Sequence, residues 1–187
     1  MKSFLSDYLA GLNAAAEAIP THVLEDITGV LKAAHQAKAR IFVIGNGGSA
    51  ATASHFACDL GKNTAQPGKP RFKVIALTDS IPAITAYGND NGYASVFREQ
   101  LVNLMEPGDV VFAISASGNS PNVVEAIDYA RENGATVIGL AGFDGGQLAL
   151  KADHAITIPA ATYEQIEDLQ LVLTHVIVSW FKANLPV

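Results

Sequence analysis

The sequence has only one cysteine, Cys58, so a disulfide within the chain is excluded and cysteine usage gives no indication of an oxidising compartment. It also lacks any run approaching roughly 18 uninterrupted apolar residues, so a membrane-spanning helix is not expected. Residues 1–20 include Asp7 and Glu17 and lack the compact apolar core of a signal peptide. We therefore expect a cytoplasmic protein.

Positive charge is scarce too. Twelve lysines and arginines stand against 18 aspartates and glutamates, the net charge is −6, and no block of like charge occurs. Without a basic field, neither nucleic acid nor a membrane surface is an expected partner, and an anionic ligand must be held by local geometry. The 187 residues, 49% of them hydrophobic, suit one domain with a full core.

Apolar, β-branched segments alternate with helical patterns along the middle of the chain. The expected strands are residues 40–46, 73–78, 109–115, 136–142 and a shorter 154–159. The expected helices between them are residues 48–61, 82–105, 121–133 and 145–151. The first four strands are almost continuously apolar, which is typical of strands buried on both faces. The alternation predicts an α/β fold with a parallel sheet between two helical layers.

Further helices are expected at both ends, over residues 3–18, 22–36 and 163–183. Residues 169–181 are apolar on nearly every side, which is typical of a helix buried all round. For a terminal helix this favours a subunit interface. The chain therefore reads as a single domain over residues 1–187. It comprises an N-terminal helical segment (1–38), an α/β core (39–160) and a C-terminal helix (161–187).

A glycine-rich turn, GNGGSA at residues 45–50, follows the first strand and begins a helix. It satisfies the loose dinucleotide-binding pattern, which also requires an acidic residue about 20 residues further on. Position 65 is Ala65, and the first acidic residue after the second strand is Asp79, 34 residues after Gly45. The dinucleotide interpretation therefore fails on spacing.

A second loop, SASGNS at residues 115–120, has the matching position after the third strand. Ser115, Ser117 and Ser120 bring three hydroxyls to a helix N-terminus, where free backbone N–H groups favour an anion. Pro121 suits the first turn of that helix. The alternative is a capping loop with incidental serines, but three serines within six residues favour phosphate.

Two histidine–carboxylate pairs follow. His55 and Asp59 are four residues apart on one helix face, a spacing that can share a metal ion or a proton but is also common on exposed helices. Glu167 and His175 lie in the last helix, and a lone histidine there could equally be a core residue. Eight helical residues separate this second pair by about 12 Å. Both could reach one ion only if two subunits contribute or the helix is broken.

Several motifs together resemble one family. In chain order they are GNGGSA, HFACDL, GND at 88–90, ISASGNSPNV at 114–123, DGG at 144–146 and QIEDLQLVLTH near the end. Over essentially the whole chain, the sequence resembles the sugar isomerase (SIS) domain and, within it, the phosphoheptose isomerases, which act on sedoheptulose 7-phosphate.

The resemblance implies a flavodoxin-like three-layer αβα fold with a five-stranded parallel sheet, a homotetramer, and active sites between subunits. It implies a phosphorylated sugar as substrate and one divalent metal per site, with zinc expected and iron(II) or manganese as alternatives. The implied substrate contacts are Asn46, Gly47, Ser49, Asp90, Ser115, Ser117, Asn119, Ser120 and Glu167. The implied metal ligands are His55, Asp59, Glu167 and His175.

Three departures from the family pattern lie close to the chemistry. Asp59 stands where the family has glutamate, and Glu167 stands where it has glutamine. The family's aspartate after the second strand aligns with Ser80, which leaves Asp79 one place early.

The function expected from these residues is aldose–ketose isomerisation of sedoheptulose 7-phosphate through metal-assisted enediolate chemistry. Asp59 and His175 are the expected acid–base pair. Two alternatives stay open: an isomerase for another phosphosugar, or a non-catalytic SIS protein that binds sugar phosphates or acts as an adaptor in replication initiation. The retained histidines and carboxylates favour an enzyme.

Overall fold

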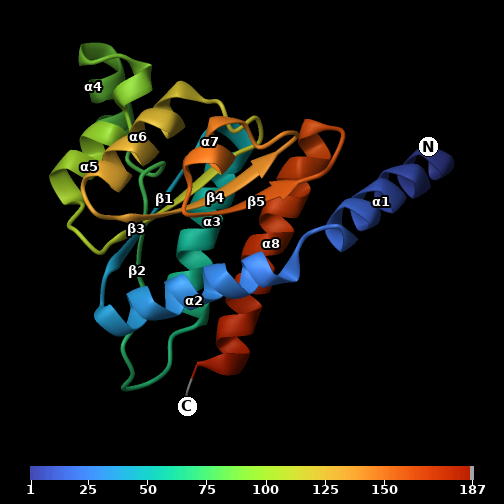
Figure 1. The fold of residues 1–187 in the computed structure, drawn as a ribbon, viewed down its shortest axis with the longest axis horizontal. Helices are drawn as coiled ribbons and strands as arrows, with labels where there is room; N and C mark the ends of the chain where they lie inside the picture. The colour runs from blue at the N-terminus through green and yellow to red at the C-terminus, as the bar shows by residue number, and fades with distance from the viewer. Residues whose placement is uncertain (186–187) are drawn as a thin grey trace.

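The computed structural model describes residues 1–185 and contains one parallel five-stranded sheet (Figure 1). The strands are β1 (Arg40–Gly45), β2 (Lys73–Ala76), β3 (Val110–Ser115), β4 (Thr136–Gly142) and β5 (His154–Ile158). Their order is β2-β1-β3-β4-β5, and every pair of neighbours is parallel. This is the flavodoxin-like order, so the predicted α/β fold class is confirmed.

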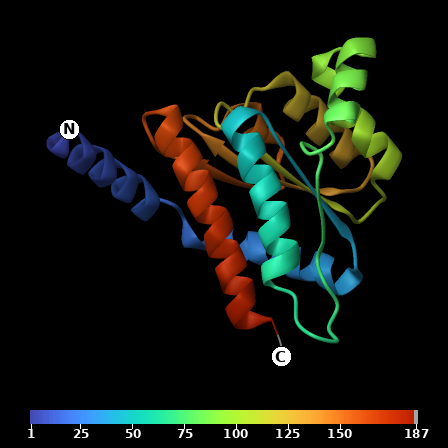
Figure 2. The same cartoon turned by 180° about the vertical axis from the view of Figure 1, so that it is seen from behind.

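Helices cover both faces of the sheet. One layer contains α2 (Thr21–Ala37), α3 (Gly47–Asn63) and α8 (Tyr163–Asn184). In Figure 2, α3 and α8 lie nearest the viewer and α2 passes behind them. The other contains α4 (Ile81–Asp90), the 3-10 turn η1 (Tyr93–Ser95), α5 (Arg98–Leu104), α6 (Pro121–Glu132) and α7 (Gly146–Lys151).

Alternate side chains of each central strand enter opposite cores. Ile41 and Val43 of β1 pack with the α2, α3 and α8 layer, whereas Phe42 and Ile44 pack with the layer that contains α5 and α6. All four are completely buried. Because a strand projects successive side chains to opposite faces, a strand with helices on both sides must be apolar at every position, as the sequence predicts for β1.

Two expectations about these elements were wrong, and a third, that α8 is buried all round, stays a prediction about an assembly. Residues 82–105 form no continuous helix, because Gly92, with a φ of 90°, ends the first helical stretch and begins a new turn. Strand β2 is not buried on both faces: it is an edge strand, and Lys73 and Ile75 are exposed. Helix α8 is buried on one side only within the chain. The apolar side chains that it leaves exposed are Val172, Val176 and Trp180.

Helix α1 (Lys2–Glu17) projects away from the rest of the molecule (Figures 1 and 2). Only Ala15 of this helix is buried. Its main tie to the body is a 2.6 Å hydrogen bond from the Tyr8 hydroxyl to the Asp168 carboxylate, which raises the pKa of Tyr8 to about 12. No helix within residues 1–185 is both long enough and apolar enough to cross a membrane.

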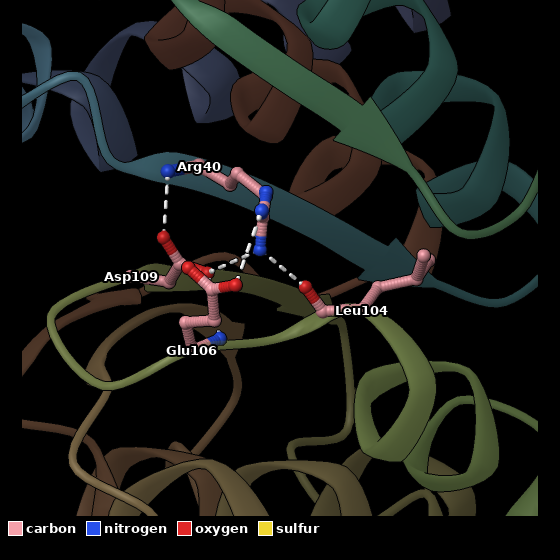
Figure 3. Close-up of polar contacts among 4 residues, drawn as sticks. All are labelled: Arg40, Leu104, Glu106 and Asp109. Carbon is pink, nitrogen blue, oxygen red and sulfur yellow. Dashed lines mark hydrogen bonds and ion pairs between the residues drawn. The ribbon is translucent and has the colours of Figure 1, made fainter.

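At the amino ends of β1 and β3, the Asp109 carboxylate joins two chain segments (Figure 3). It accepts hydrogen bonds from the backbone N–H of Arg40 (2.7 Å) and of Glu106 (2.9 Å), and it lies 3.6 Å from the Arg40 guanidinium. Arg40 also donates to the carbonyl of Leu104 at 2.6 Å. Asp109 is only 4% exposed, so each of its oxygens is committed to the fold.

We expect Asp109→Asn to lower the free energy of unfolding by about 2–3 kcal/mol, because the new amide nitrogen must face one of the two backbone donors. Urea denaturation followed by circular dichroism measures this. The exposed ion-pair partner provides the control: Glu106→Gln should change stability by less than about 1 kcal/mol. Equal effects of the two substitutions would contradict the assignment.

Candidate active site

A cleft of about 260 Å³ opens at the carboxyl edge of the sheet, where β1 and β3 lie side by side. The chain runs outward from these two strands in opposite directions, to β2 on one side and β4 on the other. This is the switch point at which flavodoxin-like folds bind ligands. The cleft is lined by Asn46, Gly47, Ser49, Ser115, Ala116, Ser117, Ser120, Tyr163 and Glu167.

Seven of the nine predicted substrate contacts are therefore in the cleft lining, and Asn119 and Asp90 are not. Asn119 instead holds its own loop: its amide donates to the carbonyl of Ser117 at 2.9 Å and accepts from the N–H of Gln147 at 3.1 Å. Asp90 is exposed at the end of α4 and accepts a hydrogen bond from Asn89. A direct substrate contact by either residue stays a prediction.

The turn after β1 brings a carboxylate against the first turn of α3. A Cβ atom at Gly48 would lie 2.2 Å from a carboxylate oxygen of Glu167, so only glycine permits this approach. The glycine-rich turn thus makes room for Glu167 of α8. A negative charge at a helix N-terminus is favourable, because the backbone dipoles and free N–H groups there are positive.

In the serine loop after β3, the Ser117 hydroxyl accepts a hydrogen bond from the Asn119 N–H at 3.2 Å, and within residues 1–185 the hydroxyls of Ser115 and Ser120 hydrogen bond only to each other. Ser120 is the N-cap residue of α6, yet its side chain makes no capping hydrogen bond, and its Oγ lies 3.3 Å from that of Ser115. The capping interpretation of Ser120 is therefore wrong. Gly118 has a φ of 63°, and a Cβ there would lie 2.0 Å from the Gly145 carbonyl oxygen. The DGG segment at 144–146 is thus the packing partner of this loop.

Behind the cleft, Asn46 and Asn122 form a reciprocal pair of amide hydrogen bonds, at 2.8 and 2.9 Å. The Tyr93 hydroxyl also donates to Asn46, at 2.9 Å. This network joins the N-termini of α3 and α6. Sequence reasoning identified Asn46 but missed Asn122 and Tyr93, as it missed Tyr163. Tyr163 had a detectable signal, since it precedes Glu167 by four residues and so shares its helix face.

A second constellation lies further along α3 and α8. The Nε2 atoms of His55 and His175 are 3.1 Å apart, and the Asp59 carboxylate lies 3.3 Å from the first and 3.8 Å from the second. Each histidine side chain is 47% exposed and that of Asp59 is 21% exposed. His175 is therefore not a core residue. It lies 120 residues after His55 in the sequence, and the packing of α8 against α3 brings the two together.

These three residues fit a divalent metal ion. Their ligand atoms all lie within 4.8 Å of one another. Donors around one tetrahedral zinc, with bonds of about 2.0–2.1 Å, lie roughly 3.3 Å apart, which is close to the separations found here. Two imidazoles and a carboxylate are common zinc ligands, and three protein ligands leave one position open, as in catalytic sites.

Glu167 is not part of this cluster within one chain. It lies against Gly48, seven residues before His55 and therefore about 10 Å away along α3. Its assignment as a fourth metal ligand has no support from the single chain and stays a prediction about an assembly. Its place in the cleft instead makes it available to a bound ligand.

The residues after β2 explain why Asp79 stands one place before the position of the family's aspartate. Asp79 accepts hydrogen bonds from the hydroxyls of Ser54 and Thr78, which draws it toward α3 one residue before His55. The hydroxyl of Ser80 accepts from the Ala83 N–H at 3.4 Å and so caps α4. The Asp79 carboxylate therefore faces α3, and the Ser80 side chain caps α4.

A parallel sheet with a serine-lined cleft at the switch point and a histidine–carboxylate cluster nearby defines a SIS-type α/β domain, and the SIS domain model matches residues 6–142. Phosphoheptose isomerases of Rhodospirillum rubrum and Mycobacterium bovis are 38% and 40% identical to this chain. The matches cover 82% of the chain and 81% of the first relative, and 86% of both sequences for the second.

Two solved structures agree. Phosphoheptose isomerase GmhA from Neisseria gonorrhoeae matches with a TM-score of 0.88 and 30% identity over 97% of this chain and 96% of that one. A phosphoheptose isomerase from Francisella tularensis matches with a TM-score of 0.89 and 25% identity, over 98% and 96%. The chain belongs to the SIS domain family and, within it, to the phosphoheptose isomerases. The prediction of an isomerase is confirmed.

Proposed function

We propose that this isomerase interconverts sedoheptulose 7-phosphate and a heptose 7-phosphate. The relatives at 38–40% identity carry the name of that activity. The observation that carries the proposal is the pairing of two sites: a cleft with three serine hydroxyls, and the cluster of His55, Asp59 and His175 about 10 Å further along α3. One phosphorylated carbon chain can occupy both.

The phosphate belongs at the N-terminus of α6 rather than at that of α3. The first turn of α3 already faces the Glu167 carboxylate, which would repel a second anion. Ser115, at the end of β3, and Ser120, the N-cap residue of α6, both line the cleft, and their hydroxyl oxygens lie 3.3 Å apart. No lysine or arginine of residues 1–185 lines the cleft, so hydroxyls and helix N–H groups hold the phosphate.

The chemistry requires a proton transfer between neighbouring carbons. A base removes a proton from C1 of the ketose while the C2 carbonyl oxygen gains one, which gives an enediol. Return of a proton to C2 and loss of the O1 proton give the aldose. Asp59 and His175 are the proposed acid–base pair, because both are polar, partly exposed and within 3.8 Å of each other. A bound divalent cation would supply stabilisation of negative charge on the sugar oxygens.

His55, Asp59 and His175 are the residues that would hold this cation, and zinc suits their donor atoms. A cytoplasmic homotetramer with active sites between subunits belongs to the same proposal. It is supported by the apolar side chains that α1 and α8 leave exposed, which are Phe4, Leu5, Leu9, Val172, Val176 and Trp180.

An isomerase for another phosphosugar is the second candidate. It is favoured by the two substituted carboxylates, Asp59 and Glu167, since one lies in the cluster with His55 and His175 and the other lines the cleft. A shorter side chain at 59 and an added charge at 167 both alter the space and the hydrogen bonds that a sugar meets.

Proton NMR of the zinc-supplemented protein with sedoheptulose 7-phosphate in heavy water tests the proposal. We expect deuterium on the carbon beside the carbonyl, an aldose product, and one metal ion per chain by elemental analysis. Absence of exchange, with assembly and metal content verified, would overturn the heptulose assignment. A panel of shorter ketose phosphates on the same sample then identifies the second candidate.

A further inference from the structure

Another cavity, of about 200 Å³, lies at the far end of α3 from the cleft. It is bounded by α2, by the loop that follows α3 and by the end of α8, and Figure 2 shows this loop and the end of α8 at the foot of the molecule. Gly47 of the cleft is the first residue of α3, and Thr64 of this cavity directly follows its last. About 25 Å of helix therefore separates the two cavities.

The charged side chains that line this cavity are cationic. They are Lys32 of α2 and Lys69 of the loop, and within residues 1–185 neither forms an ion pair and no aspartate or glutamate joins the lining. The surplus continues in the surrounding sequence. Residues 27–78 contain seven of the 12 lysines and arginines but one of the 18 aspartates and glutamates, which is Asp59 of the histidine cluster. A local surplus of positive charge favours an anion as ligand.

Short contacts hold the walls of the cavity in place. The N–H of Lys69 donates to the Gln66 carbonyl at 3.2 Å and closes a turn, whose central residues are a proline and Gly68. The φ of Gly68 is 72°, which suits the third position of a type II turn. The His35 Nε2 atom, 3.1 Å from the Pro70 carbonyl oxygen, donates to it and ties the loop to α2. The cavity is therefore formed before any ligand binds.

The uncharged polar groups of the lining favour hydroxyl groups on the ligand. The Thr64 hydroxyl donates to the Leu60 carbonyl at 2.6 Å, so toward the cavity it only accepts. The side-chain amides of Gln36 and Gln66 both donate and accept. The volume is below the about 300–1,000 Å³ that is usual for drug-sized ligands, so a compact molecule fits.

We propose that this cavity is a second ligand site, which binds a compact organic anion that carries hydroxyl groups. Lys32 and Lys69 bind its phosphate or carboxylate, and Thr64 accepts from a hydroxyl. The cleft has no lysine or arginine of residues 1–185 in its lining, so the two sites hold an anion by different means. Because the cavity shares no residue with the cleft or with the histidine cluster, the proposal is independent of the reaction that the chain catalyses.

Isothermal titration calorimetry with glycerate 3-phosphate at physiological ionic strength tests this site. The probe combines a phosphate, a carboxylate and a hydroxyl in one compact molecule. We expect Lys32→Gln and Lys69→Gln each to raise its dissociation constant by about 10-fold or more, since each substitution removes a charged hydrogen-bond donor. Wild-type affinity in both variants, or no binding by the wild-type protein at millimolar concentrations, would overturn the proposal.

Lys38→Gln is the matched control, because Lys38 is an exposed lysine at the end of α2 but lies outside the cavity lining. It should change the dissociation constant by less than about 2-fold, since salt screens the more distant charge. A loss as large as that of the cavity variants would show attraction by overall charge and refute the site.

Ser120→Ala distinguishes this cavity from the cleft, which Ser120 lines. The binding that the lysine variants lose should persist in Ser120→Ala. Binding that is lost in Ser120→Ala and kept in the lysine variants would place the probe in the cleft and contradict the proposal. Glycerate and glycerol 3-phosphate on the same samples then identify whether the carboxylate or the phosphate is the group bound by the lysines.

Discussion

His175→Ala is expected to lower kcat for the isomerisation by about 10²- to 10⁴-fold, the contribution of a positioned acid–base group. The His175 Nε2 atom lies 3.1 Å from that of His55 and 3.8 Å from the Asp59 carboxylate, so its removal takes away both a proposed acid–base group and a proposed metal ligand. His175 is 47% exposed, and its loss leaves no large cavity. The fold should therefore tolerate the change.

The measurement is the rate of deuterium incorporation into sedoheptulose 7-phosphate, alongside the bound metal per chain. His22→Ala is the control, since His22 is an exposed histidine on α2 outside the cluster. It should match wild type in turnover and in metal content. Wild-type turnover by the His175→Ala variant would remove this histidine from the mechanism. Normal metal content with lost turnover would confine its role to proton transfer.

Most of the fold could be predicted because its physical causes are local. Strands β1, β3 and β4 must be apolar at nearly every position, since helices cover both of their faces, and this pattern is visible in sequence. The edge strand β2 has one neighbour only, so Lys73 and Ile75 remain exposed, and an apolar run alone does not distinguish an edge strand from a central one. The break at Gly92 could not be predicted for a similar reason, because a single glycine within a helical pattern does not by itself indicate that the helix ends.

The site was less predictable, because it depends on packing between distant segments. The residue types and the helix of each ligand could be read, but the contact of His55 with His175 follows from how α8 lies on α3. The same packing brings Glu167 to Gly48 and hides Gln170 behind Ser49. The roles of the ligands came from resemblance to a family. No spacing rule gives a reason for a glutamine in an apolar helix.

Leu9→Glu is expected to dissociate the assembly and to abolish turnover with it. Leu9 is 51% exposed on α1, next to Leu5 on the same helix face, which is 55% exposed, and Phe4 beside Leu5 is 70% exposed. A helix that projects from the body with such a face buries it only against another chain. A carboxylate in the centre of an apolar interface must lose its water without gaining a partner, which opposes association by several kcal/mol.

Light scattering after size-exclusion chromatography measures the mass, and the heavy-water assay measures turnover on the same fractions. Ala10→Glu is the matched control, because Ala10 is exposed and lies about 100° around α1 from Leu9 and about 140° from Leu5, where a carboxylate stays in water. It should retain the mass of the proposed homotetramer and wild-type turnover. An unchanged mass for Leu9→Glu would exclude this face from the interface. A smaller species with full turnover would mean that the cleft and the His55–Asp59–His175 cluster of one chain suffice for catalysis, and Glu167 would then act only on substrate in its own cleft.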